Sequence, residues 1–405
     1  MEKKITPVLL GADLNCYSVA RAFHEKYGVV SHAFGRYTVG ATNYSRIIKF
    51  HIVKNVDEPD VMVETLTAFA EEHKDEMLVL LGCTDDYAML IINNKHRLGG
   101  KYITPYIEPD LANTMVDKAD FYSLCDKYGI LYPRTSVLTA EYDGDAFAPE
   151  KLGFDYPIIV KPSNSIEYWK HPFDGMKKVY VAHDKAEAEK IVSEIYSSGY
   201  GARMILQDMI PGDDSKMNVL TCYSGKDKKV KLAVLGHVLL EEHTPKGLGN
   251  HAAILTEYHP ELVKNFKDLL DEIGYTGFSN FDIKYDERDG SYRAFEINLR
   301  QGRSNYYLTA AGYNIAEYLI DDYIGKELSY TECDHEYLWH YIPRGVIKKY
   351  VHDKALLLRI KRAIKEKRIT STLWYAPDLV TNPKRLAYIL MHLKNHYKKY
   401  KIYCK

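Results

Sequence analysis

The clearest chemical signal in this sequence lies in Tyr292-Arg293-Ala294-Phe295-Glu296-Ile297-Asn298-Leu299-Arg300. If the segment is a strand, its side chains alternate, so that one face carries Phe295, Ile297 and Leu299 and the other carries Glu296, Asn298 and Arg300. Carboxylate and amide oxygens suit Mg²⁺, and a guanidinium on the same face suits a phosphate or a carboxylate. The pattern indicates a metal and phosphate site, with an ordinary solvated edge strand as the alternative interpretation.

A second acidic strand precedes this segment. Residues 277–286 carry Asp282 and are separated from Tyr292 by the turn-forming Glu287-Arg288-Asp289-Gly290. An antiparallel hairpin would bring Asp282 beside Glu296, so that two carboxylates and the Asn298 amide share one site. The sequence therefore predicts Asp282, Glu296 and Asn298 as metal ligands.

Length and composition are those of an ordinary globular protein. The 405 residues are 46% hydrophobic and 27% charged, with a net charge of -1, which leaves room for about two to four compact units. No N-terminal secretory signal is evident, and no apolar run approaches the ~20 residues that span a bilayer. We therefore expect a cytoplasmic protein. Scattered cysteines without a Cys-x-x-Cys pair predict free thiols rather than zinc or disulfides; they are Cys16, Cys83, Cys125, Cys222, Cys333 and Cys404.

The N-terminal region alternates between apolar strands and a helix. A buried strand at residues 8–10 precedes the loop 11–15 and a helix that ends near Gly28, and further strands follow near Val29 and at residues 77–82. This rhythm predicts a parallel sheet with ligands at the carboxyl ends of its strands. Loops 11–15 and 82–87 would then face a site, with plain strand-to-helix turns as the alternative. No Gly-x-Gly-x-x-Gly is present to indicate a dinucleotide site.

Three further segments attract attention in the middle of the chain. Lys161 ends the apolar run 156–160, where an unpaired cation is costly to bury and favours an anion nearby. Residues 204–210 form a strand that ends in Pro211-Gly212, which by itself indicates only a turn. The loop 244–251 carries Lys246 and His251 as possible substrate contacts, or else is simply a mobile surface loop.

Together these segments resemble the ATP-grasp superfamily, in which an acid on one strand and Glu-x-Asn on the next hold two Mg²⁺ ions against ATP. Glu296-x-Asn298-x-Arg300 and Lys161-Pro162 match its motifs. The resemblance implies that Lys118 and Lys161 contact the nucleotide phosphates. It also implies adenine contacts at Gln207, Asp208, Met209 and Ile210, and ribose contacts at Asp214, with Asp213 as second choice. Loop 163–175 stands where the family covers the phosphates, although it lacks the usual glycines.

A closer resemblance, over nearly all of residues 5–310, is to the bacterial D-aspartate ligases. It is carried by residues 7–25, 82–88, 105–107 and 132–135. The resemblance implies an ATP-dependent ligase that joins the β-carboxylate of D-aspartate to the lysine amine of a nucleotide-linked peptidoglycan precursor. An ATP-grasp ligase for another amino acid or small carboxylate is the alternative, because neither composition nor spacing specifies the substrate.

The expected chemistry is formation of an acyl phosphate, since a carboxylate resists attack by an amine until ATP activates it. Arg300 or Arg303 would stabilise the oxyanion that forms when the amine attacks. The amino acid would lie between Arg303, Ser304 and Asn305 on one side and the loop with Asp13 and Asn15 on the other. Loops 163–175 and 244–251 would exclude water from the intermediate.

The C-terminal region is strongly basic. From residue 343 onward there are 17 Lys or Arg against 3 Asp or Glu, a difference of 14, with helical patterning at 354–368 and 383–400. Such a region suits an anionic partner: the diphosphate of a precursor, the inner membrane surface or nucleic acid. The alternative is a pair of solvated helices packed on the enzyme. We expect no nucleic-acid partner, because no recognised binding motif is present.

The predicted fold is α/β, an ATP-grasp fold in three regions. Residues 1–110 form a Rossmann-like parallel-sheet domain. Residues 111–330 form the ATP-grasp domain, with a smaller lid at about 135–205. Residues 331–405 form the basic helical region.

Overall fold

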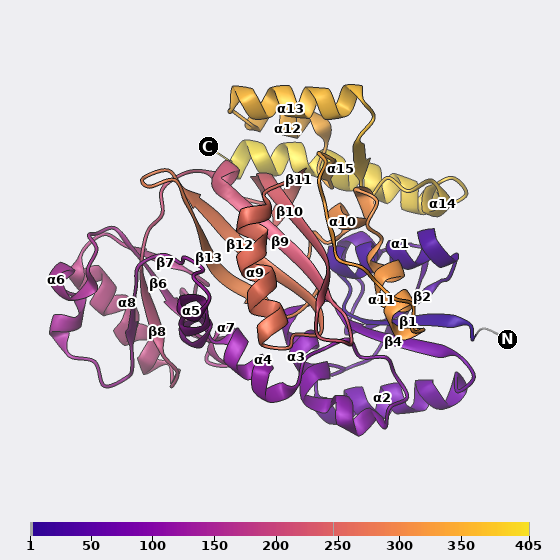
Figure 1. The fold of residues 1–405 in the computed structure, drawn as a ribbon, viewed down its shortest axis with the longest axis horizontal. Helices are drawn as coiled ribbons and strands as arrows, with labels where there is room; N and C mark the ends of the chain where they lie inside the picture. Colours follow the sequence, from indigo (N-terminus) through magenta and orange to yellow (C-terminus); the bar gives the residue numbers. More distant parts are fainter. Residues whose placement is uncertain (1–2, 246, 405) are drawn as a thin grey trace. The chain divides into compact units, whose positions relative to one another are not determined.

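The N-terminal segment folds into the parallel sheet that the alternating pattern predicts, in a computed structural model that describes residues 3–245 and 247–404 (Figure 1). Its strands are β1 (Ile5–Leu10), β2 (Ser31–Gly35), β3 (Ile48–Ile52) and β4 (Met77–Gly82), in the order β3-β2-β1-β4. Its helices are α1 (Leu14–Tyr27), α2 (Pro59–Glu72) and α3 (Asp85–Asn94). Asp13 begins α1 by accepting from the backbone N–H of Cys16, and Thr84 begins α3 by accepting from that of Tyr87. Both predicted loops therefore cap helices at the carboxyl ends of β1 and β4.

The chain divides into two compact units. Unit 1 contains the residues up to Pro109, Asp214–Asn280 and the residues from Asn298 onward; unit 2 contains Asp110–Asp213 and Phe281–Ile297. The chain passes between the units inside β13, so that Glu296 belongs to unit 2 and Asn298 to unit 1. The division into three predicted regions stays a prediction.

A large mixed sheet lies mainly in unit 1, although the β12 residues from Phe281 onward and the β13 residues up to Ile297 are assigned to unit 2. It runs in the order β13-β12-β9-β10-β11-β15-β16, with β14 beside β10. Its strands are β9 (Met217–Ser224), β10 (Val230–Glu241), β11 (His251–Glu257), β12 (Gly277–Asp286), β13 (Ser291–Asn298), β14 (Thr331–Glu332), β15 (Leu338–His340) and β16 (Ile369–Ser371). The helix α9 (Pro260–Glu272) packs on β9 and β10, and α10 (Tyr306–Ala310) and α11 (Ile315–Tyr323) pack against α1. The predicted hairpin of β12 and β13 is present.

Unit 2 contains a smaller antiparallel sheet. Its strands, in the order β5-β8-β6-β7, are β5 (Thr135–Leu138), β6 (Ile158–Pro162), β7 (Tyr180–Ala182) and β8 (Met204–Asp208). Its helices are α4 (Pro109–Val116, whose first residue belongs to unit 1), α5 (Lys118–Lys127), α6 (Pro149–Leu152), α7 (Ser165–Tyr168) and α8 (Lys185–Ser197). Asp184 caps α8 by accepting from the backbone N–H of Glu187. The segment predicted as the loop 163–175 is not entirely loop, because it contains α7.

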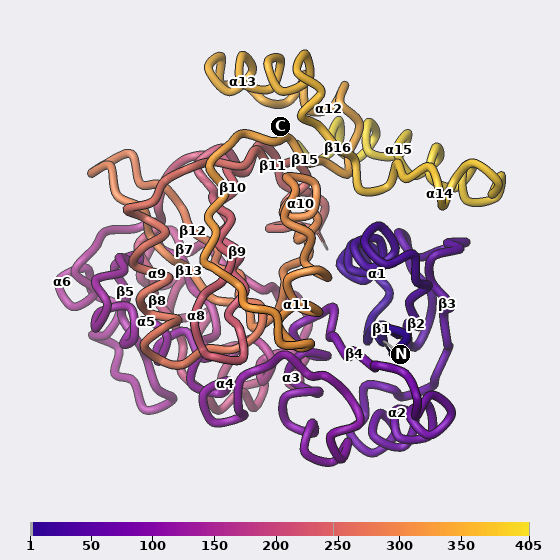
Figure 2. The backbone as a smooth tube through the Cα atoms, turned by 45° about the vertical axis from the view of Figure 1, so that its right-hand side comes forward, coloured from indigo at the N-terminus to yellow at the C-terminus, as the bar shows by residue number. Residues whose placement is uncertain are grey.

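The C-terminal region is mostly helical, as predicted, but it also completes the sheet. Its helices are α12 (Arg344–Tyr350), α13 (Lys354–Lys365), α14 (Ala376–Leu379) and α15 (Pro383–Tyr403). Its strand β16 pairs with β15, and Figure 2 shows α14 and α15 beside α1, where Tyr17 donates to the Asp378 carboxylate at 2.9 Å. The region is therefore an integral part of unit 1. No helix in the described residues combines the length and apolar character of a membrane span.

Candidate active site

In unit 2 the carboxylate of Glu296 lies among lysines. Lys118 Nζ is 2.9 Å from Glu296 Oε2, and Lys178 Nζ is 3.6 Å from Glu296 Oε1. Asp117 positions Lys118 by capping α5, since its carboxylate accepts from the backbone N–H of Ala119. Burial raises the pKa of Glu296, but Lys118 and Lys178 outweigh it and hold that pKa well below its usual range. Glu296 is therefore a carboxylate with an excess of positive charge around it.

Lys161 is about as deeply buried as Lys118, the two residues being 7% and 6% exposed. Its Nζ lies 3.4 Å from the Tyr122 hydroxyl and 5.5 Å from the centroid of the Phe295 ring. Burial and then the neighbouring Lys118 lower the pKa of Lys161 to about 7, although Glu296 opposes them. A phosphate beside Lys161 would restore its full charge.

The sequence did not single out Lys178. It stands two residues before β7, and β7 pairs with β6, which carries Lys161. The Lys177-Lys178 pair just ahead of the strand antiparallel to β6 is the signal that would have found it. Three lysines from separate segments thus face one carboxylate, which is the charge arrangement that binds a polyphosphate with metal ions.

The predicted metal ligands lie on adjacent strands, Asp282 on β12 and Glu296 and Asn298 on β13. The Asn298 amide donates from Nδ2 to the Asn280 carbonyl at 3.3 Å, a bond that does not use its Oδ1. Two carboxylates and an amide oxygen are hard donors that fit Mg²⁺. Within residues 3–245 and 247–404 no group of three or more His, Cys, Asp or Glu forms a metal cluster, and the predicted set has only two such residues.

The segment predicted to hold adenine, residues 207–210, is fixed by its side chains. Gln207 Nε2 donates to the Tyr122 hydroxyl at 2.9 Å. The Asp208 carboxylate lies 3.1 Å from Arg134 and 2.9 Å from Arg288. The side chains of Gln207 and Asp208 are thus engaged, and the Ile210 carbonyl accepts from Lys284 Nζ at 3.0 Å. The adenine role of residues 207–210 stays a prediction.

In unit 1 the two predicted catalytic arginines have different partners. Arg300 forms a two-pronged ion pair with Asp85, with both N···O distances 2.8 Å. Arg303 Nη2 lies 3.1 Å from Glu242 Oε1, and its Nε lies 3.9 Å from Asp13 Oδ2. Among the described residues the buried Arg303 Nη1 has no hydrogen-bond partner. Arg303 therefore retains donor capacity for a ligand.

Asn15 belongs to a buried amide network. Its Oδ1 accepts from Gln301 at 3.0 Å and from Asn305 at 2.8 Å, and its Nδ2 donates to the Cys83 carbonyl at 2.9 Å. Asn15 and Asn305 are fully buried, and Ser304 is 4% exposed. The network fixes the segment that leaves β13 and carries Arg303, while among the described residues the buried Gln301 Oε1 and Asn305 Oδ1 have no hydrogen-bond partner. The substrate role of Asn15, Ser304 and Asn305 stays a prediction.

Of the two substrate residues predicted in the N-terminal region, Asp13 has the accessible side chain, which is 32% exposed. Burial raises its pKa, and Arg303 opposes the rise. Gly302, at φ +69°, packs so closely that a Cβ would lie 2.3 Å from Asn280 Oδ1. Only glycine therefore fits between Arg303 and the Asn280 side chain.

Asp214, the predicted ribose ligand, lies in a short 3₁₀ turn, Asp214–Lys216. Its Oδ2 accepts from the Glu241 backbone N–H at 2.8 Å and lies 2.7 Å from His243 Nε2. The prediction of loop structure through His251 is wrong at that residue, because β11 begins there and His251 pairs with Glu241 of β10. Lys246, the other predicted contact of that loop, lies outside the described residues.

Comparisons with known proteins agree with this picture, although no protein-family model matches the chain. The chain is 37% identical over 385 residues to the D-aspartate ligase of Enterococcus faecium (strain Aus0004), a match that covers 93% of this chain and 91% of that protein. It resembles the structure of N5-carboxyaminoimidazole synthetase from Staphylococcus aureus complexed with ADP, with a TM-score of 0.61 and 15% identity over 89% of this chain and 87% of that one.

A second structural relative is the biotin carboxylase domain of 2-oxoglutarate carboxylase from Hydrogenobacter thermophilus, in complex with MgADP, ADP and bicarbonate. Its TM-score is 0.60 at 16% identity, over 82% of this chain and 72% of that one. The structural likenesses confirm the predicted α/β fold of ATP-grasp type, and nucleotide and magnesium in these structures agree with the predicted cofactors. The identity to the Enterococcus enzyme is high and spans nearly the whole chain, so the chain belongs to the D-aspartate ligase family of ATP-dependent carboxylate–amine ligases.

Proposed function

We propose that this ligase activates the β-carboxylate of D-aspartate with ATP and joins it to a lysine amine of a nucleotide-linked peptidoglycan precursor. The observation that carries the nucleotide half of the proposal is the group of Lys118, Lys161 and Lys178 around Glu296. The name of the Enterococcus relative supports the choice of acid.

The lysines of unit 2 bind the triphosphate in this proposal. Lys118 and Lys178 release Glu296 as they turn to phosphate oxygens, and Lys161 takes up a proton to complete the positive charge. Asp282, Glu296 and Asn298 would hold Mg²⁺, which would supply positive charge to neutralise the phosphates. Attack of the substrate carboxylate on the γ-phosphate then gives an acyl phosphate and ADP.

The arginines of unit 1 bind the acid and the developing oxyanion. Arg303 presents Nη1 to the substrate, while Glu242 binds Nη2 of the same guanidinium. Arg300, oriented by Asp85, is the second cation for the tetrahedral oxyanion that forms when the amine attacks. Loss of phosphate from that intermediate leaves the amide.

The precursor is the proposed acceptor because its diphosphate suits the basic C-terminal region, and we propose a cytoplasmic location, where ATP is available. Peripheral contact of α13 with an anionic membrane surface is part of the same proposal, since α13 carries Lys354, Arg359, Lys361, Arg362 and Lys365. No nucleic-acid partner is proposed.

The test is phosphate release from ATP in the presence of a panel of D- and L-amino acids, with and without a nucleotide-linked precursor that carries a lysine. We expect D-aspartate with the precursor to give the largest rate. A larger rate with L-aspartate, or with an acid that lacks a β-carboxylate, would refute the choice of substrate. Phosphate release indifferent to every acid would refute the ligase mechanism itself.

A further inference from the structure

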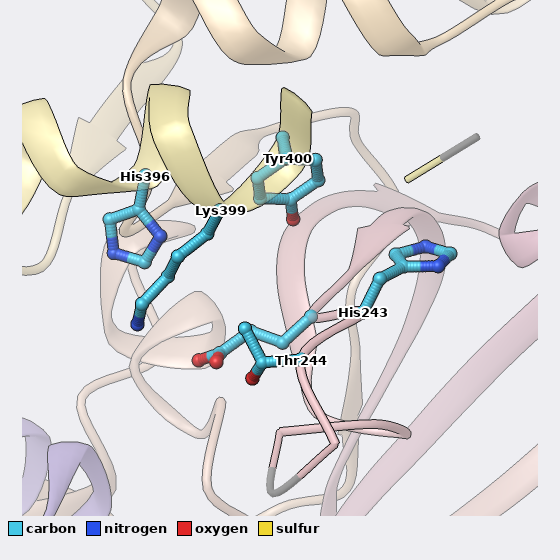
Figure 3. Close-up of a pocket in the computed structure, with 6 residues that line it drawn as sticks. His243, Thr244, His396, Lys399 and Tyr400 are labelled. Carbon is cyan, nitrogen blue, oxygen red and sulfur yellow. The ribbon is translucent and has the colours of Figure 1, made fainter. Parts of the chain in front are cut away.

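A narrow pocket lies in unit 1 between the end of β10 and the C-terminal helix α15 (Figure 3). The residues that line it are Glu242, His243, Thr244, His396, Lys399 and Tyr400. Figure 3 shows His396, Lys399 and Tyr400 extending from α15 toward the segment that carries His243 and Thr244. The pocket has room for about one water-sized group, so it suits one end of a small ligand rather than a nucleotide base.

Long-range contacts fix α15 in this position. The Tyr400 hydroxyl donates to the Glu241 carbonyl of β10 at 2.6 Å. The His396 ring meets the Tyr341 ring edge-on, with 5.4 Å between centroids. The pocket wall is therefore held by hydrogen bonding and packing, so the position of Lys399 does not depend on a loose tail.

The pocket lies directly beside the predicted substrate residues. Glu242 is the partner of Arg303, at 3.1 Å, and the next residue, His243, is the partner of Asp214, at 2.7 Å. The guanidinium of Arg303 also lies 5.2 Å from the centroid of the Tyr341 ring, the same ring that His396 contacts. Consecutive residues at the end of β10 thus connect this pocket to both the ribose and the amino-acid predictions.

Within the described part of the chain, cationic and donor groups without partners lie in the pocket, at Lys399 and His396, and next to it, at Arg303. Among the described residues Lys399 makes no hydrogen bond or ion pair. The buried Arg303 Nη1 and His396 Nδ1 have no hydrogen-bond partner in the same part of the chain. His396 is 1% exposed, and its Nε2 lies 3.2 Å from His392 Nε2; when that nitrogen accepts, Nδ1 carries an N–H that faces no acceptor. A buried donor without an acceptor destabilises the folded protein, and an anionic ligand would supply the missing acceptor.

We propose that this pocket takes one oxygen of the α-carboxylate of the amino-acid substrate, with Lys399 in its lining and Arg303 beside it as the cations, and with Glu242 as the acceptor for the substrate ammonium. Two cations and one carboxylate are the complement of an α-amino acid head group. The assignment rests on the proposed ligase function and gives the basic C-terminal helix a role in substrate recognition. It leaves the β-carboxylate outside the pocket for phosphorylation.

The test is Lys399→Gln in the full chain, with Lys398→Gln as the matched control. Lys398 is the adjacent residue of α15, exposed and without an ion pair among the described residues. We expect Lys399→Gln to raise KM for the acid about tenfold, as loss of one charge-assisted hydrogen bond does, and to leave KM for ATP unchanged. Lys399→Arg should restore most of the wild-type KM, and Lys398→Gln should resemble the wild type.

If Lys399→Gln raises KM for ATP and not KM for the acid, the pocket binds a phosphate and the assignment is wrong. Equal KM values for the acid in Lys399→Gln and Lys398→Gln would also overturn it. Thermal denaturation of each variant verifies that it is folded.

Calorimetric binding of D-asparagine separates this inference from the proposed function, because this compound keeps the α-carboxylate and ammonium but has no β-carboxylate to phosphorylate. Wild type should bind it and Lys399→Gln should bind it about tenfold more weakly, whether or not turnover occurs. Equal binding by the two, or none by the wild type, refutes the pocket.

Discussion

Two carboxylates, Glu296 in unit 2 and Asp378 in unit 1, are surrounded in opposite ways. Glu296 is one acceptor facing Lys118, Lys178 and, further away, Lys161. Asp378 is fully buried and accepts from Tyr17 at 2.9 Å, Ser45 at 3.0 Å and the Arg46 backbone at 2.7 Å, besides its ion pair with Arg385 at 3.1 Å.

The difference distinguishes a ligand site from a structural ion pair. The lysines around Glu296 carry more charge than one carboxylate can neutralise, so the group is completed only by an anion. At Asp378 one buried carboxylate meets one buried guanidinium and three further donors, so the charge is already balanced. A buried pair of the second kind stabilises chiefly because removal of one partner leaves the other charge uncompensated.

The largest effect that would test this contrast is on turnover. Glu296→Gln removes one negative charge from the metal site with almost no change of shape, and we expect phosphate release to fall by at least about a hundredfold, because metal ions contribute several kcal/mol of charge stabilisation. The measurement is steady-state phosphate release. Glu194→Gln, an exposed position on α8, is the control, and near wild-type turnover in Glu296→Gln would remove this residue from the metal site.

Asp378→Ala should act on stability instead. We expect the free energy of unfolding to fall by about 3–5 kcal/mol, because Arg385, 0% exposed, loses its counter-charge. Denaturant unfolding measures the change, and Glu194→Ala, which removes an exposed i,i+4 pair with Lys190, should cost at most about 0.5 kcal/mol. If both substitutions cost the same, the Asp378 pair is not the structural counterpart described above.

The next largest expected effect is on KM for the amino-acid substrate. Arg303→Lys keeps the charge but loses the forked geometry, and we expect KM for the amino acid to rise about tenfold with little change in KM for ATP. Arg344→Lys is the matched control, because Arg344 is exposed and forms no ion pair among the described residues. An unchanged KM for the acid would place the substrate carboxylate elsewhere in unit 1.

The smallest effect concerns pH and Lys161. Burial lowers the pKa of Lys161 to about 7, below its unfolded value, so the free protein prefers the neutral amine above that pH. Bound phosphates favour the charged amine, so ATP binding should take up a proton. The affinity should then fall about fivefold from pH 7 to pH 8 as the charged fraction drops from about 1/2 to 1/11. Calorimetry in buffers of different ionisation enthalpy measures the uptake, and Lys161→Met should abolish it; proton release on binding would contradict the assignment.

The sequence predicted the elements whose signal is local. Alternation along residues 292–300 placed Glu296 and Asn298 on one face of β13, and the alternation of strands and helices near the N-terminus predicted the parallel sheet. The basic composition suggests that residues 343–405 form a separate tail, which a deletion would remove without harm to the fold. The structure leads us to expect that this deletion unfolds unit 1. It would remove β16 and the Arg385–Asp378 pair together.

The sequence by itself determined the strand of the predicted metal site and the family resemblance, because periodicity and motif order depend on neighbouring residues and covalent geometry. Only the tertiary structure showed that Lys178 reaches Glu296, that Glu242 holds Arg303, and that Lys399 lines a pocket with Glu242. These contacts join residues far apart in the chain and result from the packing of whole helices and strands. A lysine on an amphipathic helix carries no local sign of the carboxylate that it will meet.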